Sequence, residues 1–278
     1  MPDPLAVPID SSAAAILGAV QGATEFLPVS SSGHVALTSM LLGVSEEMPL
    51  SMVVLLHFGT LVATVVVFAK DLRELTKSSW AGIRSGPKEF LQTDHGKIVA
   101  GVFVASIPTA IIGLGLESRV EDYSRIQWVV GLGLLVSAVA VLSTRRGGGG
   151  LESLTLDKAL IVGVAQGIAV LPGISRSGST IAVAMLLGLS GPAAFRFSFL
   201  LSLPAVAGAT VLSLRHTEEL RALGTAGIVG GVVAAIVGLA ALIWLRALVN
   251  QGRFWTFAVY LIPLGLGLVG WHVYTLST

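Results

Sequence analysis

The chain has 278 residues, of which 54% are hydrophobic and 12% are charged, and its mean hydropathy is +0.86. Soluble domains carry roughly 25% charged residues, and a chain of this length has too much surface to keep so many apolar side chains from water. The composition therefore excludes a soluble globular enzyme and a disordered chain. The net charge of +1 predicts no nucleic-acid partner, and the absence of cysteine excludes disulfides, thiolate metal sites and cysteine nucleophiles.

Six segments contain no Asp, Glu, Lys or Arg and are close to the roughly 20 residues that cross a bilayer. They predict spanning helices at 48–69, 98–116, 126–144, 197–214, 222–245 and 254–278. The fold class predicted is an all-α polytopic membrane protein that forms one integral membrane domain over residues 1–278.

Two longer apolar segments are interrupted. Residues 11–45 contain one charge, Glu25, and residues 159–195 contain one charge, Arg176. Each is broken near its middle, by Leu-Pro-Val-Ser-Ser-Ser-Gly-His at 27–34 and by Leu-Pro-Gly-Ile-Ser-Arg-Ser-Gly-Ser-Thr at 171–180. Because proline removes a backbone donor and serine competes for backbone hydrogen bonds, each segment is predicted to be a re-entrant hairpin of two short helices. Such irregular backbone is tolerated at membrane depth only inside protein or beside a water-filled cavity.

The two interrupted segments repeat one another. Gln21-Gly22 matches Gln166-Gly167, and Ser30-x-Ser32-Gly33 matches Ser175-x-Ser177-Gly178, both at an offset of 145. Three predicted spans follow each hairpin, so the second half starts on the opposite side of the membrane. This predicts an inverted-topology repeat of 11–144 and 158–274, joined by a cytoplasmic Gly-rich link at 145–157.

The orientation follows from the basic residues of the loops. Eleven Lys and Arg residues lie at 70–97, 145–158, Arg246 and Arg253, against four on the other side. The side with eleven is predicted to be cytoplasmic, which places both termini outside. The first residues carry acids and no Lys or Arg, so the first apolar segment is not expected to be a cleaved signal peptide.

Glu25 and Arg176 stand at corresponding places in the two halves, and each costs about 2.5–3.5 kcal/mol at membrane depth. They form either a structural ion pair or part of an aqueous site, and the many hydroxyls around them favour a site. A half-helix begins after each break, and its free N–H groups attract anions. With the planar guanidinium of Arg176, they predict a binding site for a multiply charged anion such as a diphosphate. The residues predicted to bind it are Gln21, Ser30, Ser31, Ser32, Ser175, Ser177 and Thr180.

Gln21 and Glu25 share one helix face because they are four residues apart. With phosphate oxygens and water they are a candidate site for Mg²⁺ or Ca²⁺, and Glu25 is alternatively a general base. His34 is a candidate nucleophile, base or leaving-group acid. His57 is as readily explained by structure as by function.

The segment 21–34, Gln-Gly-Ala-Thr-Glu-Phe-Leu-Pro-Val-Ser-Ser-Ser-Gly-His, resembles the acidic motif of undecaprenyl-diphosphate phosphatases, the bacitracin-resistance membrane proteins. The segment 172–180, Pro-Gly-Ile-Ser-Arg-Ser-Gly-Ser-Thr, resembles the phosphate-binding motif of the same family, and 57–60 and 197–204 also resemble family segments. The resemblance implies hydrolysis of undecaprenyl diphosphate to undecaprenyl phosphate at the outer face of the bacterial inner membrane, with a divalent cation. That reaction recycles the lipid carrier of peptidoglycan synthesis.

By position, the resemblance places Gln21 and Glu25 in the acidic motif, and Ser175, Arg176, Ser177 and Thr180 in the phosphate-binding motif. Ser31 is favoured as the nucleophile, with Glu25 or His34 as base and Arg176 stabilising the phosphoryl charge. Attack by His34 or by water stays open. The sequence also leaves open a transporter or flippase for a phosphorylated lipid, because inverted repeats are common in transporters, and a homodimer packed through Gly-rich helices.

Overall fold

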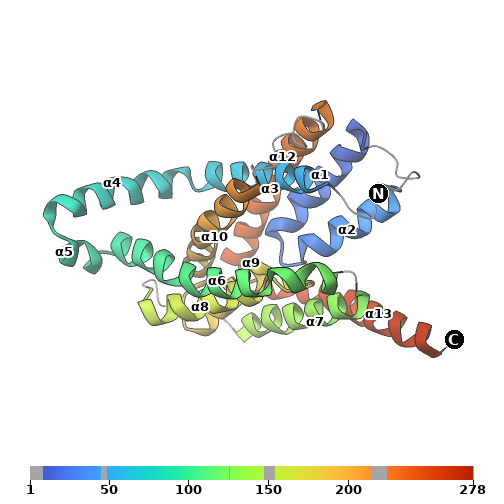
Figure 1. Ribbon diagram of the computed structural model, residues 1–278. Coiled ribbons are helices and arrows are strands. Elements are labelled where there is room, and N and C mark those ends of the chain that lie inside the picture. Colours follow the sequence, from blue (N-terminus) through green and yellow to red (C-terminus); the bar gives the residue numbers. More distant parts are fainter. Residues whose placement is uncertain (1–8, 45–48, 125, 147–153, 214–223, 278) are drawn as a thin grey trace.

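The computed structural model describes residues 9–44, 49–124, 126–146, 154–213 and 224–277, and every regular element within them is helical (Figure 1). The first half contains α1 (Ser11–Phe26), α2 (Ser31–Leu41), α3 (Leu50–Val67), α4 (Ala69–Ser85), α5 (Pro87–Gln92), α6 (Asp94–Ser124) and α7 (Gln127–Ser143). The second contains α8 (Leu156–Ile168), α9 (Arg176–Leu186), α10 (Gly191–Ser213), α12 (Gly224–Asn250) and α13 (Ala258–Ser277). Short 3₁₀ turns, η1 (Thr144–Arg146) and η2 (Phe254–Phe257), follow α7 and precede α13.

The prediction of a polytopic membrane protein is confirmed. Among the described residues, three helical segments are long and apolar enough to cross a bilayer: Asp94–Leu116, Gly224–Asn250 and Phe254–Ser277. A fourth is added if α3 and α4, which are bent by 70° at their junction, form one crossing. Along α6, large apolar side chains recur on one face and stay exposed, at Phe103, Ile107, Ile111 and Leu114. In a membrane this stripe faces lipid rather than water.

Both predicted helix breaks are present. The chain leaves α1 at Phe26 and re-enters helix at Ser31, and it leaves α8 at Ile168 and re-enters helix at Arg176. The first turn ends at Ser30, whose φ of 67° is the only positive value among the described non-glycine residues. A serine in this region carries backbone strain of order 1–3 kcal/mol, which the surrounding structure must offset.

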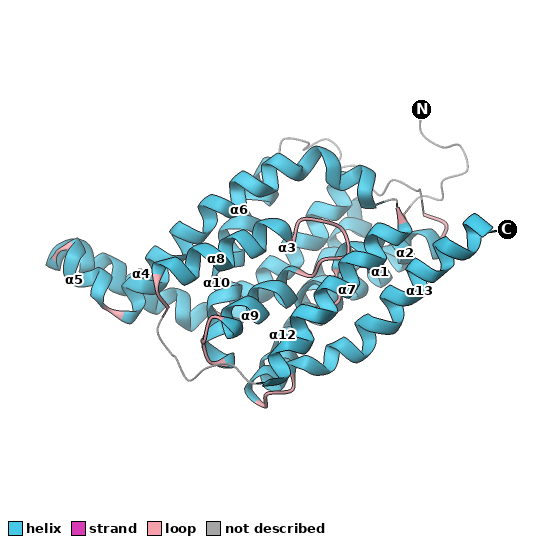
Figure 2. Cartoon of the chain, turned by 90° about the horizontal axis from the view of Figure 1, so that it is seen from below, coloured by secondary structure: helices cyan, strands magenta, loops and turns pink. Residues whose placement is uncertain are grey.

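The two halves pack crosswise. The first helix of each half lies against the long helix of the other half, α1 on α12 and α8 on α6 (Figure 2). Gly18 and Gly22 bring α1 onto the backbone of α12, while Gly163 and Gly167, each 145 residues later, bring α8 onto α6. The two pairs are the same small-x-x-x-small pattern, which lets helix backbones approach closely in a membrane.

Gly22→Ala is expected to destabilise the protein, because the added Cβ would lie 2.6 Å from the Ala234 carbonyl oxygen and 2.8 Å from the Gly238 nitrogen. Backbone atoms cannot swing away, so a cost of about 1–3 kcal/mol follows from overpacking. Gly115→Ala is the matched control, since nothing lies within 4 Å of its Cβ position. Thermal unfolding in detergent measures both, and equal midpoints for the two variants would contradict the close α1–α12 contact.

The prediction of a loop over 70–97 is wrong. This segment is helical in α4, α5 and the start of α6, and Figure 1 shows α4 and α5 as an arm at one side of the molecule. The charges of α4 are at helical spacing, as in the pair Lys70–Glu74 at 4.0 Å, so the segment is a surface helix rather than a loop. The Gly147–Gly150 tract of the predicted link lies outside the described residues.

Helix α10 begins at Gly191, six residues before the span predicted at 197–214. The predicted span began after Arg196 because it was defined as a segment without charge. Arg196 is nevertheless part of α10, where its charge is compensated by Asp71 of α4: Arg196 Nε donates to Asp71 Oδ1 at 2.5 Å. Glycines of the apolar helices pack within the chain: Gly131 of α7 lies against Gly265 of α13, and these helices run side by side (Figure 2), while Gly133 lies against the backbone of Pro172 and Gly173.

Candidate active site

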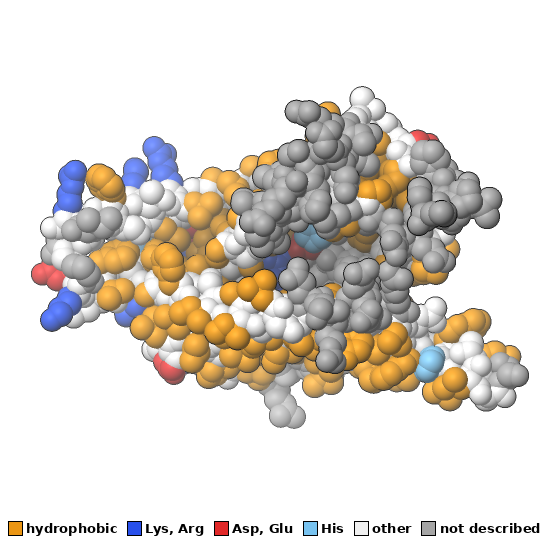
Figure 3. All heavy atoms as spheres, viewed as in Figure 1, with side chains coloured by type: hydrophobic (Ala, Val, Ile, Leu, Met, Phe, Trp, Pro, Cys, Tyr) orange, Lys and Arg blue, Asp and Glu red, His pale blue; other side chains and the backbone are white. Residues whose placement is uncertain are grey.

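The two helix breaks meet in the interior. Gly178 in the first turn of α9 lies against Pro28 of the first break, where an added Cβ would approach the proline ring to 3.0 Å. This contact brings together Glu25 in the last turn of α1 and Arg176 at the start of α9, and Arg176 Nη2 donates to Glu25 Oε1. Acidic, basic and histidine side chains are visible together in a central hollow of the face shown in Figure 3. The ion pair, one of the two interpretations of these charges, is therefore present, and both side chains also line a cavity, as the other interpretation requires.

Both oxygens of Glu25 are engaged. Oε1 accepts from Arg176, while Oε2 accepts from Ser31 Oγ at 2.7 Å and from Gln21 Nε2 at 3.0 Å. The carboxylate side chain is 8% exposed, so its charge is stabilised by these donors rather than by water. The Ser31 hydroxyl points at a carboxylate oxygen, which is the arrangement that a general base needs toward a nucleophile.

One nitrogen of the Arg176 guanidinium lacks a hydrogen-bond partner among the described residues. This nitrogen is Nη1, which is buried, while Nη2 is taken by Glu25. An unsatisfied buried donor costs about 1–3 kcal/mol, more when charged. Arg176 also lines a cavity and its side chain is 19% exposed, so its positive charge is within reach of an anion there.

The cavity beside this pair has a volume of about 430 Å³ and is lined by both polar and apolar side chains. Its polar residues are Thr24, Glu25, Ser30, Ser31, Ser32, His57, Ser175, Arg176 and Thr210, and its apolar residues are Val53, Val54, Ala169, Val170, Ile174, Ala205 and Val206. A ligand that suits both kinds of side chain has an anionic head and a hydrocarbon portion.

The serines of the two breaks form matching contacts. Ser30 and Ser32 share a hydrogen bond of 3.4 Å, and Ser175 and Ser177 share one of 3.2 Å. Four of the predicted hydroxyls line the cavity: Ser30, Ser31, Ser32 and Ser175. The structure does not bring Ser177 to the cavity lining, although the residue is buried beside it.

Thr180 also lies away from the cavity. Its hydroxyl donates to the Arg176 carbonyl oxygen at 2.8 Å and shares a hydrogen bond of 2.5 Å with Ser198 of α10. These bonds hold the first turn of α9 in place. Ser137 of α7 acts similarly, because its Oγ accepts from the Ser175 N–H at 2.8 Å and donates to the Gly173 carbonyl at 3.3 Å. The predicted anion-binding role of Thr180 is thus replaced in this geometry by a positioning one.

The two helix N-termini differ. In α9 the Ser175 Oγ accepts from the Gly178 N–H at 3.1 Å, so this end is partly capped by its own chain. In α2 the residue before the helix, Ser30, makes no capping bond. The first N–H groups of α2 therefore remain available to an anion at the side of the cavity where Ser31 lies.

His34 is turned away from Glu25. Its Nε2 lies 2.6 Å from the Tyr260 hydroxyl of α13, and its Nδ1 lies 2.9 Å from the Ser30 carbonyl oxygen. It is absent from the lining of the cavity. The structure therefore does not join His34 to the cluster that the sequence predicted, although Tyr260 connects it to the second half of the chain.

His57 occupies the place expected for His34. Its Nε2 lies 3.8 Å from Glu25 Oε2, and its Nδ1 lies 2.9 Å from the Val53 carbonyl oxygen. A proton on Nδ1 that binds this carbonyl leaves Nε2 free to accept a proton in the cavity. The His-Phe-Gly-Thr segment at 57–60 was the available signal, but sequence alone did not indicate which face of α3 meets α1.

The residues present do not form a resident metal site. Glu25 is the one carboxylate at the cavity and is already neutralised by Arg176. Gln21 lies outside the lining and turns its amide nitrogen, not its oxygen, toward Glu25. No group of three His, Asp or Glu side chains suited to a metal is found in the described part of the chain, whereas Mg²⁺ and Ca²⁺ need six or more oxygen ligands.

The chain matches a protein family over most of its length. Residues 14–267 match the family described as bacitracin resistance protein BacA. Among curated relatives, three proteins named undecaprenyl-diphosphatase are similar over 257, 265 and 260 residues, in Korarchaeum cryptofilum (39% identical, 92% of this chain and 97% of the relative), Desulfosudis oleivorans (43%, 92% and 96%) and Mycolicibacterium smegmatis (37%, 90% and 92%). The structural site lies inside the matched region, and the chain belongs to the BacA family of bacitracin resistance proteins.

Proposed function

We propose that this protein is an undecaprenyl-diphosphatase, which hydrolyses undecaprenyl diphosphate to undecaprenyl phosphate and inorganic phosphate. The relatives carry that name. The observation that supports it most directly is the cluster of Ser31, Glu25 and Arg176 in a cavity lined by both polar and apolar side chains. A polyprenyl diphosphate likewise combines a charged head with a hydrocarbon chain.

The substrate would bind with its diphosphate at the breaks. The free Nη1 of Arg176 and the uncapped N–H groups of α2 supply donors, and the serine hydroxyls add further ones. The prenyl chain would lie along the valines, alanines and isoleucine of the lining and leave the cavity between helices into the bilayer.

The chemistry proposed is nucleophilic catalysis by Ser31. Its Oγ forms a bond to the terminal phosphorus while the bond from that phosphorus to the bridging oxygen breaks, and undecaprenyl phosphate leaves. Glu25 Oε2, at 2.7 Å, takes the hydroxyl proton, and Arg176 stabilises the phosphoryl oxygens. Water then hydrolyses the phosphoserine and releases phosphate. Attack by a water molecule held by Glu25 is the alternative with the same net reaction.

In this proposal a divalent cation, Mg²⁺ or Ca²⁺, binds together with the diphosphate and is not held by the protein alone. Phosphate oxygens and water would supply most of its ligands, with Glu25 as the one carboxylate in reach. When bound, the cation supplies charge neutralisation to the diphosphate.

Phosphate release from undecaprenyl diphosphate by the purified protein tests the function. Wild type is expected to release phosphate with Mg²⁺ or Ca²⁺ and to stop when a chelator is added. Ser31→Ala is expected to lose about 10³-fold in kcat and to form no phosphoserine. The matched control is Ser106→Ala, whose hydroxyl bonds only the Val102 carbonyl of its own helix. No release by wild type would overturn the function, whereas a phosphorylated Ser31→Ala protein would overturn only the nucleophile.

The two histidines give a second test. His57→Gln is expected to lower kcat by about 10²-fold, at the low end of what a proton-transfer group contributes. His34→Gln is expected to lower it by less than tenfold, since His34 is held by Tyr260 outside the cavity. Steady-state kinetics of the two variants distinguishes them. A larger loss for His34→Gln would mean that this side chain turns into the cavity when substrate binds.

The finer topology is also part of the proposal. Six crossings and two re-entrant hairpins, related by an inverted repeat, fit the crosswise packing of α1 on α12 and of α8 on α6. The excess of basic residues predicts that α4 and α5 are cytoplasmic and that both termini and the active site face outward. We place the protein in the plasma membrane, as a monomer or a homodimer.

A flippase for undecaprenyl phosphate is the second candidate, favoured by the same crosswise packing of two halves. Its test is transfer of the lipid across sealed vesicles by Ser31→Ala protein, which separates movement from hydrolysis. Absence of transfer would remove this candidate and leave the phosphatase unaffected.

A further inference from the structure

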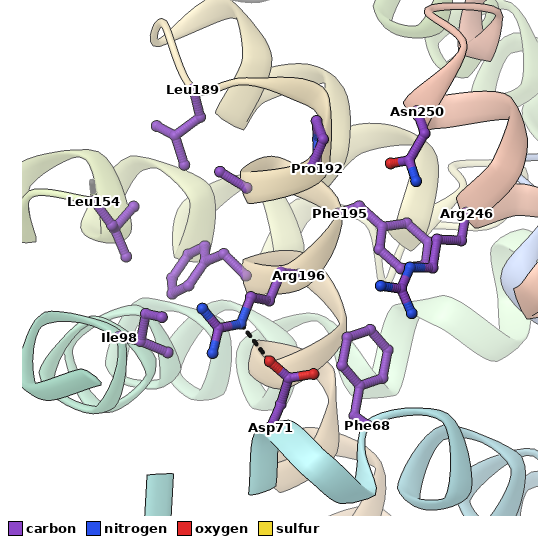
Figure 4. Close-up of a pocket in the computed structure, with 12 residues that line it drawn as sticks. Phe68, Asp71, Ile98, Leu154, Leu189, Pro192, Phe195, Arg196, Arg246 and Asn250 are labelled. Carbon is purple, nitrogen blue, oxygen red and sulfur yellow. Dashed lines mark hydrogen bonds and ion pairs between the residues drawn. The ribbon is translucent and has the colours of Figure 1, made fainter. Parts of the chain in front are cut away.

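Helices α3 and α10 both line the active-site cavity, and a second cavity lies at the end of α3 and the start of α10. It has a volume of about 270 Å³ and is formed by the α3–α4 junction, the start of α10, the end of α12, α6 and the segment before α8 (Figure 4). The lining residues on which its chemistry depends are Asp71, Arg196, Arg246 and Asn250. Neither the proposed catalysis nor the resemblance of the motifs uses any of them.

The two cavities are separate. Along α10, the second cavity is lined as far as Phe197 and the active-site cavity from Ala205 onward, so roughly 12 Å of helix lies between them at 1.5 Å per residue. Buried phenylalanines fill part of this interval: Phe199 packs on Phe26, with ring centroids 5.8 Å apart, and on Phe195, at 4.7 Å. An anion in one cavity therefore cannot be in contact with the other.

The second cavity has an excess of positive charge. Its three charged residues are Asp71, Arg196 and Arg246, which leave a net charge of +1. Arg196 uses only Nε toward Asp71, at 2.5 Å, and in Figure 4 the other guanidinium nitrogens point away from that carboxylate. Arg246 makes no ion pair or hydrogen bond with any described residue, and Figure 4 shows its guanidinium and the Asn250 amide on the side opposite Arg196.

Helix ends do not change the sign of this charge. The start of α10 contributes a positive dipole end at Pro192 and Ala193, and the end of α12 contributes a negative one at Asn250. These opposite ends offset one another. The arginine side chains therefore decide that the cavity attracts an anion rather than a cation.

The position of the cavity indicates which anions reach it. Arg246 lies two residues after Trp244, which is 53% exposed, and the turn that follows α12 carries Trp255 against Arg145, with 4.8 Å between guanidinium carbon and ring. Exposed tryptophan and arginine mark the boundary between hydrocarbon and headgroups. At that depth the abundant anions are lipid phosphates, and free phosphate enters from the adjoining water.

We propose that this cavity binds a phosphate group on the side formed by Arg246 and Asn250, which are its donors, while Arg196 adds positive charge from the other side of the cavity. The site takes a lipid headgroup phosphate or inorganic phosphate at the end of the bundle opposite the active site. Its volume suits one phosphate with a few waters and is below the 300–1,000 Å³ typical of pockets for larger ligands.

Native mass spectrometry tests the site in Arg176→Ala protein, in which the active-site arginine is removed. The probes are dioleoylphosphatidylglycerol, dioleoylglycerol without phosphate, and inorganic phosphate. One phosphatidylglycerol is expected to be retained and dioleoylglycerol not. Arg246→Gln is expected to weaken retention about tenfold, Arg246→Lys to recover part of it, and Arg253→Gln, a neighbouring basic residue outside the lining, to have less than a twofold effect.

A competition experiment between phosphatidylglycerol and inorganic phosphate identifies which of the two the site binds. Displacement of the lipid by inorganic phosphate assigns the site to the free anion, and retention assigns it to the headgroup. The site is overturned if neither phosphate probe binds, if dioleoylglycerol binds equally well, or if Arg246→Gln and Arg253→Gln weaken binding alike. Should Arg246→Gln not fold, Asn250→Ala replaces it with the same expected direction. Phosphate release by Arg246→Gln in the wild-type background is expected to stay normal, which separates this site from the proposed catalysis.

Discussion

Glu25→Gln is expected to lower kcat for phosphate release by about 10³-fold, within the range of a lost general base. The substitution keeps the shape of the side chain but removes its charge. It leaves one acceptor oxygen where the carboxylate has two, so Ser31 Oγ, 2.7 Å from Oε2, and Arg176 on Oε1 cannot both keep their partner. Ser31 would then be un-ionised throughout the reaction, and a buried guanidinium would lack its counter-charge. Single-turnover kinetics on undecaprenyl diphosphate measures the chemical step directly.

Asp71→Asn is the matched control for Glu25→Gln, because it also removes the acid of a partly buried arginine–carboxylate pair, that with Arg196. It is expected to change stability and to leave kcat within about threefold. A kcat for Glu25→Gln within threefold of wild type would remove Glu25 from the proposed chemistry. Equal losses in both variants would instead indicate a general effect of an unpaired buried arginine.

Arg176→Lys is expected to lower kcat by about 10²–10³-fold, the cost of losing a preorganised donor to transition-state charge. A lysine keeps the positive charge but cannot bind Glu25 with one nitrogen and phosphate with another, as the planar guanidinium can. Because Arg176 is proposed to bind the diphosphate in the ground state as well, KM is expected to rise. Full kinetic curves separate the two effects, and Arg253→Lys serves as a control for the same exchange at an exposed site.

The double variant Glu25→Gln/Arg176→Lys gives the coupling between the two residues. Residues that act as one unit are strongly non-additive, so the double variant is expected to be little slower than the worse single variant. Losses that add in free energy would mean that the two side chains act on separate steps. That result would contradict the ion pair as the organising contact of the site.

Local features of the site were predictable from the sequence. Gln21 and Glu25 share a helix face because of the 3.6-residue period, and their side chains are hydrogen-bonded at 3.0 Å. Proline and serine marked both breaks, and the charge beside each break indicated an ion pair or an aqueous site. Ser31 follows the break directly, so its distance from Glu25 is limited by a short turn.

Features that depend on helix rotation were not predictable. His34 and His57 are both near the first break in sequence or in space, yet His34 faces Tyr260 and His57 faces Glu25. Which face of α2 or α3 turns inward depends on contacts with α12 and α13, more than 150 residues away. The same limit applies to Thr180, whose hydroxyl binds Ser198 rather than lining the cavity.

The sequence by itself determined the membrane class, the two broken segments and the pair of intramembrane charges, because composition, backbone breakers and the cost of burying charge are properties of short stretches. The tertiary structure alone decided the exchange of His34 for His57 beside Glu25 and the cavity at Arg196 and Arg246. These depend on how α3, α10 and α12 cross one another. Crossing is set by close packing of glycines and phenylalanines from both halves, and a local glycine pattern does not say which distant helix it will pack against.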